Sequence, residues 1–251
     1  MSKRVAVLMG GRSTEREASL RSGRACAAAL EQQGYRVTRI DVGRDIATLL
    51  HTLRPEVAVN LMHGGHGGDG VVQGMLEMLA IPYTHSGVLA SALAVRSDLS
   101  DPIFRAAQIP VADGLSRPDG AKAGQDLACA VVGDKALGVA KILQAPASDD
   151  RDRQPASSGS THVLPAPVSP AIYEETRRHA LAAHRALGCR GVSQVAFRYH
   201  DGTDGGGLVC LKVQAHPEMA ETSLLPELAA HAGMPFGDLV KWMVDDASLN
   251  R

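Results

Sequence analysis

Residues 5–17 read VAVLMGGRSTERE, an apolar run that ends in two glycines and is followed by a polar stretch. An unbroken apolar run of this length is typical of a strand buried on both faces of a parallel sheet, and the glycines suit a tight turn behind it. Thr14 and Glu17 have the spacing of a capping box, which predicts a helix from here to about Gln33. A strand, a turn and a helix in this order predict the first unit of an α/β domain.

The same alternation of strands and helices continues along the chain. The strand predicted at Val57–Met62 ends in the glycine-rich loop His63–Gly70, so both glycine-rich turns fall at carboxyl ends of parallel strands, where such domains bind ligands. Polar stretches at Arg117–Gly124 and 145–160 predict a linker and a mobile loop. The other predicted strands are Tyr35–Val42, Asp126–Val132, Ala136–Ile142, Ser193–Tyr199 and Gly207–Val213, and the other predicted helices are Ile46–Leu53, Val71–Leu79, Val95–Pro110, Ser169–Leu187, Leu224–Ala232 and Phe236–Asp246.

Composition narrows the class of protein. The chain has 251 residues, 45% of them hydrophobic, and a formal net charge of -1. Because a nucleic acid or an anionic membrane surface favours a basic partner, we expect neither as a partner. Four widely spaced cysteines predict buried free thiols, since zinc and redox sites need closer spacing. No targeting segment or long apolar run is present, which predicts a cytoplasmic location.

Three sequence blocks carry a family resemblance. They are residues 5–17, the stretch HGGHGGDG at 63–70 and the stretch YTHSGVLASALA at 83–94. In this order they resemble D-alanine–D-alanine ligases, ATP-grasp enzymes of peptidoglycan synthesis, and the resemblance resumes from Asp126 onward. It implies an N-terminal Rossmann-like (pre-ATP-grasp) parallel α/β domain at 1–94 and a connecting helix and linker at 95–124. A reduced ATP-grasp α+β domain, without its central lid subdomain, would follow at 125–251.

The resemblance also implies roles for particular residues. Glu15 matches a glutamate that orients the amino group of the first D-alanine, and the amino end of a helix favours a carboxylate there. His63 matches the histidine that holds the first substrate near its carboxylate. Ser223 and Leu224 match the pair that captures the carboxylate of the second D-alanine, where the start of a helix offers free N–H groups. The implied ligand is D-alanine or a similar amino acid.

Other positions depart from the family pattern, which uses ATP and Mg²⁺. The resemblance implies three positions that hold magnesium ligands in the family. In this chain those positions are occupied by Ala196, Lys212 and Gln214. A family lysine that contacts ATP is replaced by Ser97. Because phosphoryl transfer depends on the metal and on basic residues around the phosphates, we expect neither cofactor to bind well. Four further positions differ in charge from the family pattern. Gly65, Gly68 and Gln194 stand where the family has charged residues, and Glu218 stands where it has glycine.

These observations favour a catalytically inactive relative of the ligases that retains a pocket of the D-alanine type. Two alternatives remain open, a functional D-alanine–D-alanine ligase with an atypical ATP site and a scaffold or interaction protein without catalysis. A decaying gene product is a further possibility. The family forms dimers through its N-terminal region, so a homodimer in which the helical stretch Leu20–Leu30 takes part is also an expectation.

Overall fold

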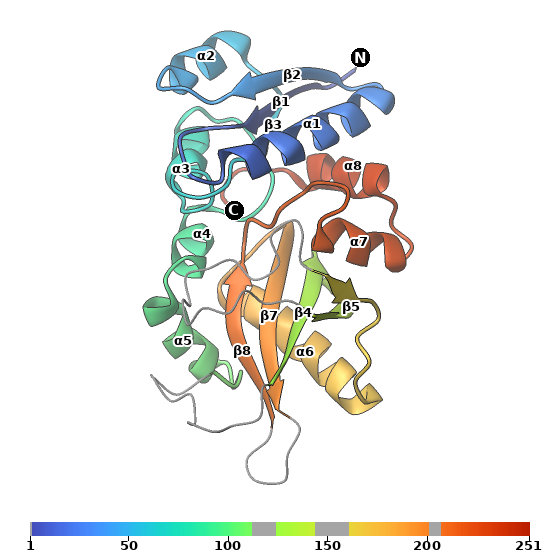
Figure 1. Cartoon of the computed structure of the whole chain (residues 1–251). Helices are drawn as coiled ribbons and strands as arrows, with labels where there is room; N and C mark the ends of the chain where they lie inside the picture. Colours follow the sequence, from blue (N-terminus) through green and yellow to red (C-terminus); the bar gives the residue numbers. More distant parts are fainter. Residues whose placement is uncertain (1, 112–123, 144–160, 201–206) are drawn as a thin grey trace.

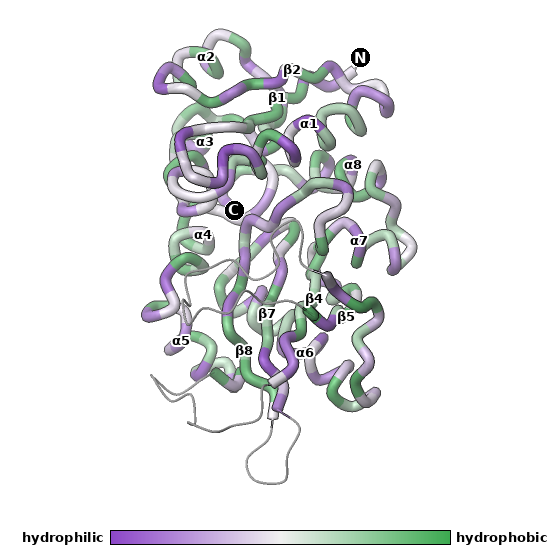
Figure 2. Tube along the Cα trace, viewed as in Figure 1, coloured by the Kyte–Doolittle hydropathy of each residue, from purple (hydrophilic) through white to green (hydrophobic). Residues whose placement is uncertain are grey.

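The computed structural model describes residues 2–111, 124–143, 161–200 and 207–251. Its first sheet is parallel, with β1 (Arg4–Met9) in the centre between β2 (Arg36–Asp41) and β3 (Val57–Asn60). Val5, Ala6, Val7 and Leu8 of β1 are almost fully buried, as the apolar run predicted; this strand is hydrophobic in Figure 2. Its helices are α1 (Arg16–Gln32), which packs against β1 and β2, α2 (Ile46–Leu53) and α3 (Val71–Met78).

The second sheet is antiparallel. Its order is β6 (His162–Val163), β5 (Lys135–Ile142), β4 (Gln125–Val132), β7 (Val192–His200) and β8 (Gly207–Gln214). Successive residues of β4 face opposite sides, as strand geometry requires. Leu127, Cys129 and Val131 belong to the apolar cluster on the side of α6 (Pro170–Ala186). Alternate residues of this strand therefore pack into two separate hydrophobic layers, one on each face of the sheet.

The other face of the antiparallel sheet shares its core with the parallel sheet. Ala128, Ala130 and Val132 of β4 belong to the same buried cluster as Val5 and Val57. This cluster also contains apolar side chains of α7 (Leu224–His231) and α8 (Phe236–Asp246), which lie between the two sheets in Figure 1. A continuous core thus joins both ends of the chain, and the division at 1–94, 95–124 and 125–251 stays a prediction.

The helix predicted at Val95–Pro110 is wrong in its bounds. The predicted helix corresponds to α5 (Ser97–Ala106), and a separate helix that was not predicted, α4 (Val88–Ala94), precedes it. Arg96 has an extended conformation between them, with φ −124° and ψ 91°, and its guanidinium donates to the Asp98 carboxylate at 2.8 and 2.6 Å. An extended residue cannot continue a helix, so the chain turns here. The short strand β6 was not predicted, because two residues carry no periodic pattern.

The predicted capping box is also wrong. α1 begins at Arg16 with Glu15 in the N-cap position, and no side chain caps it. The hydroxyl of Ser13 accepts instead from the backbone N–H of Glu15 at 3.2 Å. Thr14 is therefore too early in the chain to cap the helix.

The side chains of Leu20–Leu30 are largely used within the chain. Leu20, Cys26, Ala27 and Leu30 are buried, and α1 packs on β1, β2 and α8. The exposed side of this stretch carries Arg21 and Arg24, and its part in a homodimer stays a prediction.

The other sequence expectations have mixed outcomes. All four cysteines are free and buried, as predicted. No described helix is long and apolar enough to cross a membrane. Apart from Gly124, the predicted linker and the loop at 145–160 lie outside the described residues.

The contact between α1 and β1 leads to a stability prediction. A Cβ on Gly23 would lie 2.5 Å from the Cβ and Sδ of Met9. Alanine at a helix position gains about 1 kcal/mol of propensity over glycine, but overpacking of a core costs about 1–3 kcal/mol. We expect Gly23→Ala to lower the free energy of unfolding by about 1 kcal/mol, measured by urea denaturation. Gly65→Ala, where a Cβ would meet nothing within 4 Å, is the control; an equal loss in both variants would contradict the packing argument.

Candidate functional site

The loop His63–Gly70 is fixed by side chains that bond to its backbone. Asn60 and Gln73 both donate to the carbonyl of Gly67, at 2.9 and 3.0 Å. The carboxylate of Asp69 accepts from the N–H of His66 at 2.8 Å. A Cβ on Gly67 would lie 2.6 Å from Met62, so glycine is required there for packing. The loop geometry does not depend on charged residues at positions 65 and 68.

The structure brings Glu15 and His63 together through Ser13. The hydroxyl of Ser13 donates to the carbonyl of His63 at 2.6 Å and accepts from the N–H of Glu15 at 3.2 Å. Glu15 is half-buried, and its Oε1 would be 3.5 Å from a Cβ on Gly64. The first turn of α1 and the loop after β3 therefore form one wall of the candidate site.

The ring of His63 is buried beside α1. Its Nε2 lies 3.2 Å from the hydroxyl of Ser22, which also accepts from the N–H of Met219 at 3.1 Å. Burial lowers the pKa of His63 to about 4, with Glu218 opposing the shift and Arg21 adding to it. His63 is therefore a neutral imidazole at pH 7, able to donate and accept hydrogen bonds but without a positive charge.

Two further histidines pack against His63. The ring centroids of His63 and His216 are 5.7 Å apart with the planes at 71°, and those of His85 and His216 are 4.2 Å apart with the planes at 35°. Burial lowers the pKa of His85 to about 3, with His63 and Arg251 adding to the shift. Burial lowers the pKa of His216 well below its usual value, with His85 and His63 adding to the shift. Both ring nitrogens of His216 and Nε2 of His85 are buried without a hydrogen-bond partner among the described residues. We call these three residues the histidine cluster.

Ser223 stands at the start of α7, in the N-cap position, with φ −85° and ψ 155°. Its hydroxyl is buried and has no hydrogen-bond partner among the described residues. Leu224, the first residue of the helix, is also buried. The segment that leads to Ser223 is tied to α1, because Met219 bonds to Ser22 and the carboxylate of Glu218 accepts from Arg21 at 3.1 Å.

The strand pair β7–β8 brings the three predicted metal positions together. Ala196 is paired with Lys212 in the antiparallel register, and Gln214 is paired with Gln194. Ala196 is buried, with 5% of its surface exposed. Within the described residues, no group of three or more His, Cys, Asp or Glu side chains is arranged to hold a metal ion.

Comparisons with known proteins identify the family. The family model described as D-ala D-ala ligase C-terminus matches residues 119–245. The D-alanine–D-alanine ligase of Methylocella silvestris is 48% identical over 307 residues, covering 100% of this chain and 100% of the relative. The chain belongs to the D-alanine–D-alanine ligase family. A ligase of Methylorubrum extorquens is 49% identical over 309 residues, again with 100% of both covered.

Solved structures of ligases of this family share the fold. The D-alanine–D-alanine ligase of Bacillus anthracis, solved in complex with ATP, matches with a TM-score of 0.80 and 22% identity, covering 98% of this chain and 97% of that chain. The predicted class, a parallel α/β part followed by a reduced antiparallel ATP-grasp part, is confirmed. The alignment with the Methylocella silvestris ligase is 307 residues long, whereas this chain has 251, so it includes positions where this chain has no residue.

The side chains at the metal positions do not fit magnesium. Magnesium prefers hard oxygen ligands in near-octahedral geometry, whereas β7 and β8 present a methyl group at Ala196, an ammonium at Lys212 and an amide at Gln214. Ser97, at the position of a lysine that contacts ATP in the family, is the exposed first residue of α5. The roles assigned to Glu15, His63, Ser223 and Leu224 stay predictions.

Sequence reasoning missed the residues that surround His63. Ser22 had a usable signal, since it lies one helical turn after Ser19 on the apolar face of α1, where a polar residue needs a partner. His85 stood inside one of the resemblance blocks without an assigned role. His216 had no local signal, because the cluster joins three loops that are distant in the sequence.

The buried histidines predict an acid-sensitive stability. Their pKa in the unfolded chain is ~6.5, whereas in the folded chain it is about 4 for His63 and about 3 for His85. The unfolded state therefore binds more protons once the pH falls below ~6.5, and stability decreases as the pH falls further. From pH 7 to 5 we expect a loss on the order of 2 kcal/mol for each of these two residues. Urea midpoints at the two pH values measure it.

The variant His85→Gln should reduce this dependence, because one of the buried imidazoles of the cluster is then absent. His51 is exposed on α2 and provides the control, His51→Gln, which should keep the wild-type dependence. An unchanged pH dependence in His85→Gln would contradict the assignment of the effect to the cluster.

Proposed function

We propose that this chain is a non-catalytic member of the D-alanine–D-alanine ligase family that binds D-alanine or a similar amino acid. The observation that carries the first half is the register of β7 and β8, which pairs Ala196 with Lys212. A lysine ammonium within about 4 Å of a divalent ion would repel it by several kcal/mol even at an effective dielectric of ~20. Without the metal, the charge on transferring phosphates is not neutralised.

Several charged groups that the family uses for catalysis are replaced in this chain at once. Removing one preorganised group of this kind costs about 10²-fold in rate or more. Three metal positions and one ATP-contacting position are changed together, at Ala196, Lys212, Gln214 and Ser97. Compensation by the remaining residues would have to restore many orders of magnitude. This favours inactivity over a functional ligase with an atypical ATP site.

The amino-acid end of the site supports the second half of the proposal. Glu15 lies at the amino end of α1, where a carboxylate is stabilised by the helix dipole and can pair with a substrate ammonium. His63 is linked to Glu15 through Ser13, and its carbonyl is fixed by that hydroxyl. The buried hydroxyl of Ser223 has no partner among the described residues and stands beside the first N–H groups of α7, which suit a carboxylate. The ammonium of a first D-alanine at Glu15 and the carboxylate of a second at Ser223, as the resemblance implies, would therefore each find a matching group.

Isothermal titration with D-alanine tests the binding half. We expect Glu15→Gln to weaken D-alanine binding about tenfold or more, because the carboxylate that would pair with the ammonium is lost. Glu17→Gln is the matched control, since Glu17 is an exposed acid in the same helical turn, and it should bind as the wild type does. Ser223→Ala should weaken binding without changing the fold. If the wild-type protein binds neither D-alanine nor D-alanyl-D-alanine, the amino-acid pocket is absent. The alternative of a scaffold or interaction protein is then favoured.

Titration with Mg-ATP, together with an assay for ADP release and dipeptide formation, tests the catalytic half. We expect no magnesium-dependent ADP release above the background of buffer. Formation of ADP and D-alanyl-D-alanine by the purified protein would contradict inactivity and establish the ligase alternative. L-alanine in place of D-alanine shows whether any binding is stereoselective.

A further inference from the structure

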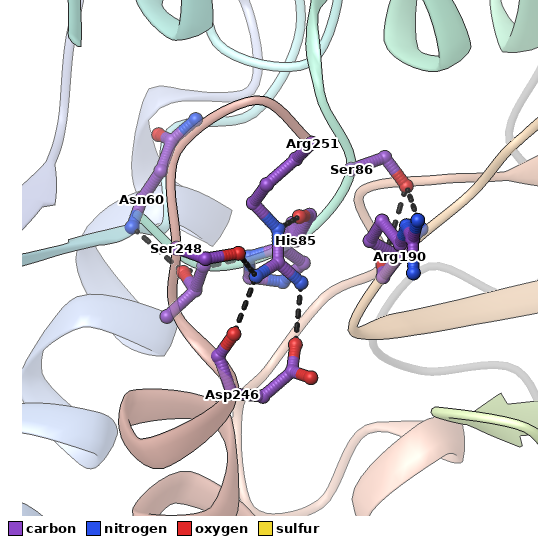
Figure 3. A network of polar contacts seen from close by, with 8 residues as sticks. Asn60, His85, Ser86, Arg190, Asp246, Ser248 and Arg251 are labelled. Atoms are coloured by element: carbon purple, nitrogen blue, oxygen red, sulfur yellow. Dashed lines mark hydrogen bonds and ion pairs between the residues drawn. The ribbon is translucent and has the colours of Figure 1, made fainter. Parts of the chain in front are cut away.

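Arg251 is almost completely buried by contacts with two parts of the chain. Its side chain is 2% exposed. The guanidinium donates to the carbonyl of His85 at 2.6 Å, to the carbonyl of Asp246 at 2.5 Å and to the hydroxyl of Ser248 at 2.9 Å, and it pairs with the Asp246 carboxylate. Figure 3 shows these groups arranged around the guanidinium. The contacts with Asp246 and Ser248 lie within residues 246–251, whereas the contact with His85 reaches a distant loop.

That loop, residues 83–87, is held along its length by the same segment. Tyr83 forms an antiparallel bridge with Ser248, and its N–H donates to the Ser248 carbonyl at 3.3 Å. A Cβ on Gly87 would lie 1.8 Å from the carbonyl oxygen of Arg251, so the backbones touch there. On the other side, the hydroxyl of Ser86 lies 3.2 Å from the N–H and 3.3 Å from the carbonyl of Arg190 (Figure 3). The position of His85 is therefore set through its backbone.

The ring of His85 has few polar contacts of its own. Its Nδ1 lies 3.0 Å from the hydroxyl of Thr84, and its Nε2 is buried without a partner among the described residues. Its ring stacks on His216, which in turn faces His63. Arg251, the backbone and ring of His85, the ring of His216 and the ring of His63 therefore form a continuous series of contacts.

We propose that Arg251 is a positioning residue for the amino-acid site, which keeps the histidine cluster packed and so fixes the ring of His63. The inference rests on the proposed function in one respect, namely that His63 faces the bound amino acid. The charged groups nearest to the cluster are Arg251 beside His85, and Arg21 and Glu218 beside His63. Loss of the guanidinium would free the 83–87 loop, separate His85 from His216 and open the far side of the His63 ring.

The first test uses the ligand-free protein and the ring signal of His63 in nuclear magnetic resonance. His63 is two rings away from Arg251, so it reports on packing of the cluster. We expect the pKa of His63 to rise by about one unit or more in Arg251→Ala, because the ring becomes better hydrated. Arg177→Ala is the matched control, since Arg177 also donates to a backbone carbonyl and a carboxylate, of Ala136 and Glu174. An unchanged His63 titration in a folded Arg251→Ala protein would overturn the proposal.

The second test measures D-alanine affinity by isothermal titration. We expect about tenfold weaker binding in Arg251→Ala, since a binding group that is held less firmly loses affinity. Equal affinity in the variant and the wild type would refute the positioning role. If the wild type binds no D-alanine, the proposed function is wrong, and the His63 titration still decides whether Arg251 positions the cluster.

Two milder variants keep the test decisive if Arg251→Ala does not fold. Arg251→Lys keeps the charge but cannot donate to His85, Asp246 and Ser248 together, so we expect an intermediate change in both readouts. Ser248→Ala removes one contact and leaves the bond to His85, so we expect the His63 titration to match the wild type. An Arg251→Lys protein that matches the wild type in both readouts would overturn the proposal.

Discussion

The hydroxyl of Ser22 connects three distant parts of the chain at one buried point. It accepts from the N–H of Met219 and lies 3.2 Å from Nε2 of His63. A buried backbone N–H without a partner would cost about 1–3 kcal/mol, so this bond fixes where the segment after β8 meets α1. The segment then leads to α7, whose side chains belong to the core shared by both sheets. The position of Ser223 relative to His63 depends on this junction.

The charges around the junction differ from those that a ligase of this family would need. Glu218 is buried and pairs with Arg21, which offsets the cost of removing its carboxylate from water. Lys212 is paired with Ala196 on the strand pair where the resemblance implies a magnesium site. His63 is neutral because burial lowers its pKa. The groups that the resemblance assigns to amino-acid binding are the half-buried carboxylate of Glu15, the neutral ring of His63 and the hydroxyl of Ser223, a set that suits a zwitterion better than a triphosphate with its metal.

Much of the fold follows from local patterns in the sequence. The apolar run at Val5–Met9 predicted its strand, because burial on both faces leaves a direct trace in the sequence. The helix α4 was not predicted, because residues 83–94 were used for the family resemblance and not for a secondary-structure pattern. In the site, Glu15 and His63 were assigned through the family resemblance, and their roles stay predictions. The histidine cluster could not be found in this way, because its members meet only through the packing of both sheets on α7 and α8.

The changes at the metal positions are also favourable for folding when no metal is bound. Position 196 is buried in β7, between β4 and β8. A carboxylate at such a position costs several kcal/mol unless a cation or hydrogen bonds compensate it. Alanine at position 196 carries no such cost.

Glu15, in contrast, is half-buried at a helix start, where a carboxylate is stabilised without any metal. Selection for a stable fold alone would thus remove the buried acid and tolerate the one at the helix start. The presence of Glu15 is therefore weaker support for ligand binding than the buried hydroxyl of Ser223, which has no partner among the described residues. A water molecule or a ligand that reaches this hydroxyl would complete its hydrogen bonding, and a ligand there is what the proposed amino-acid site requires.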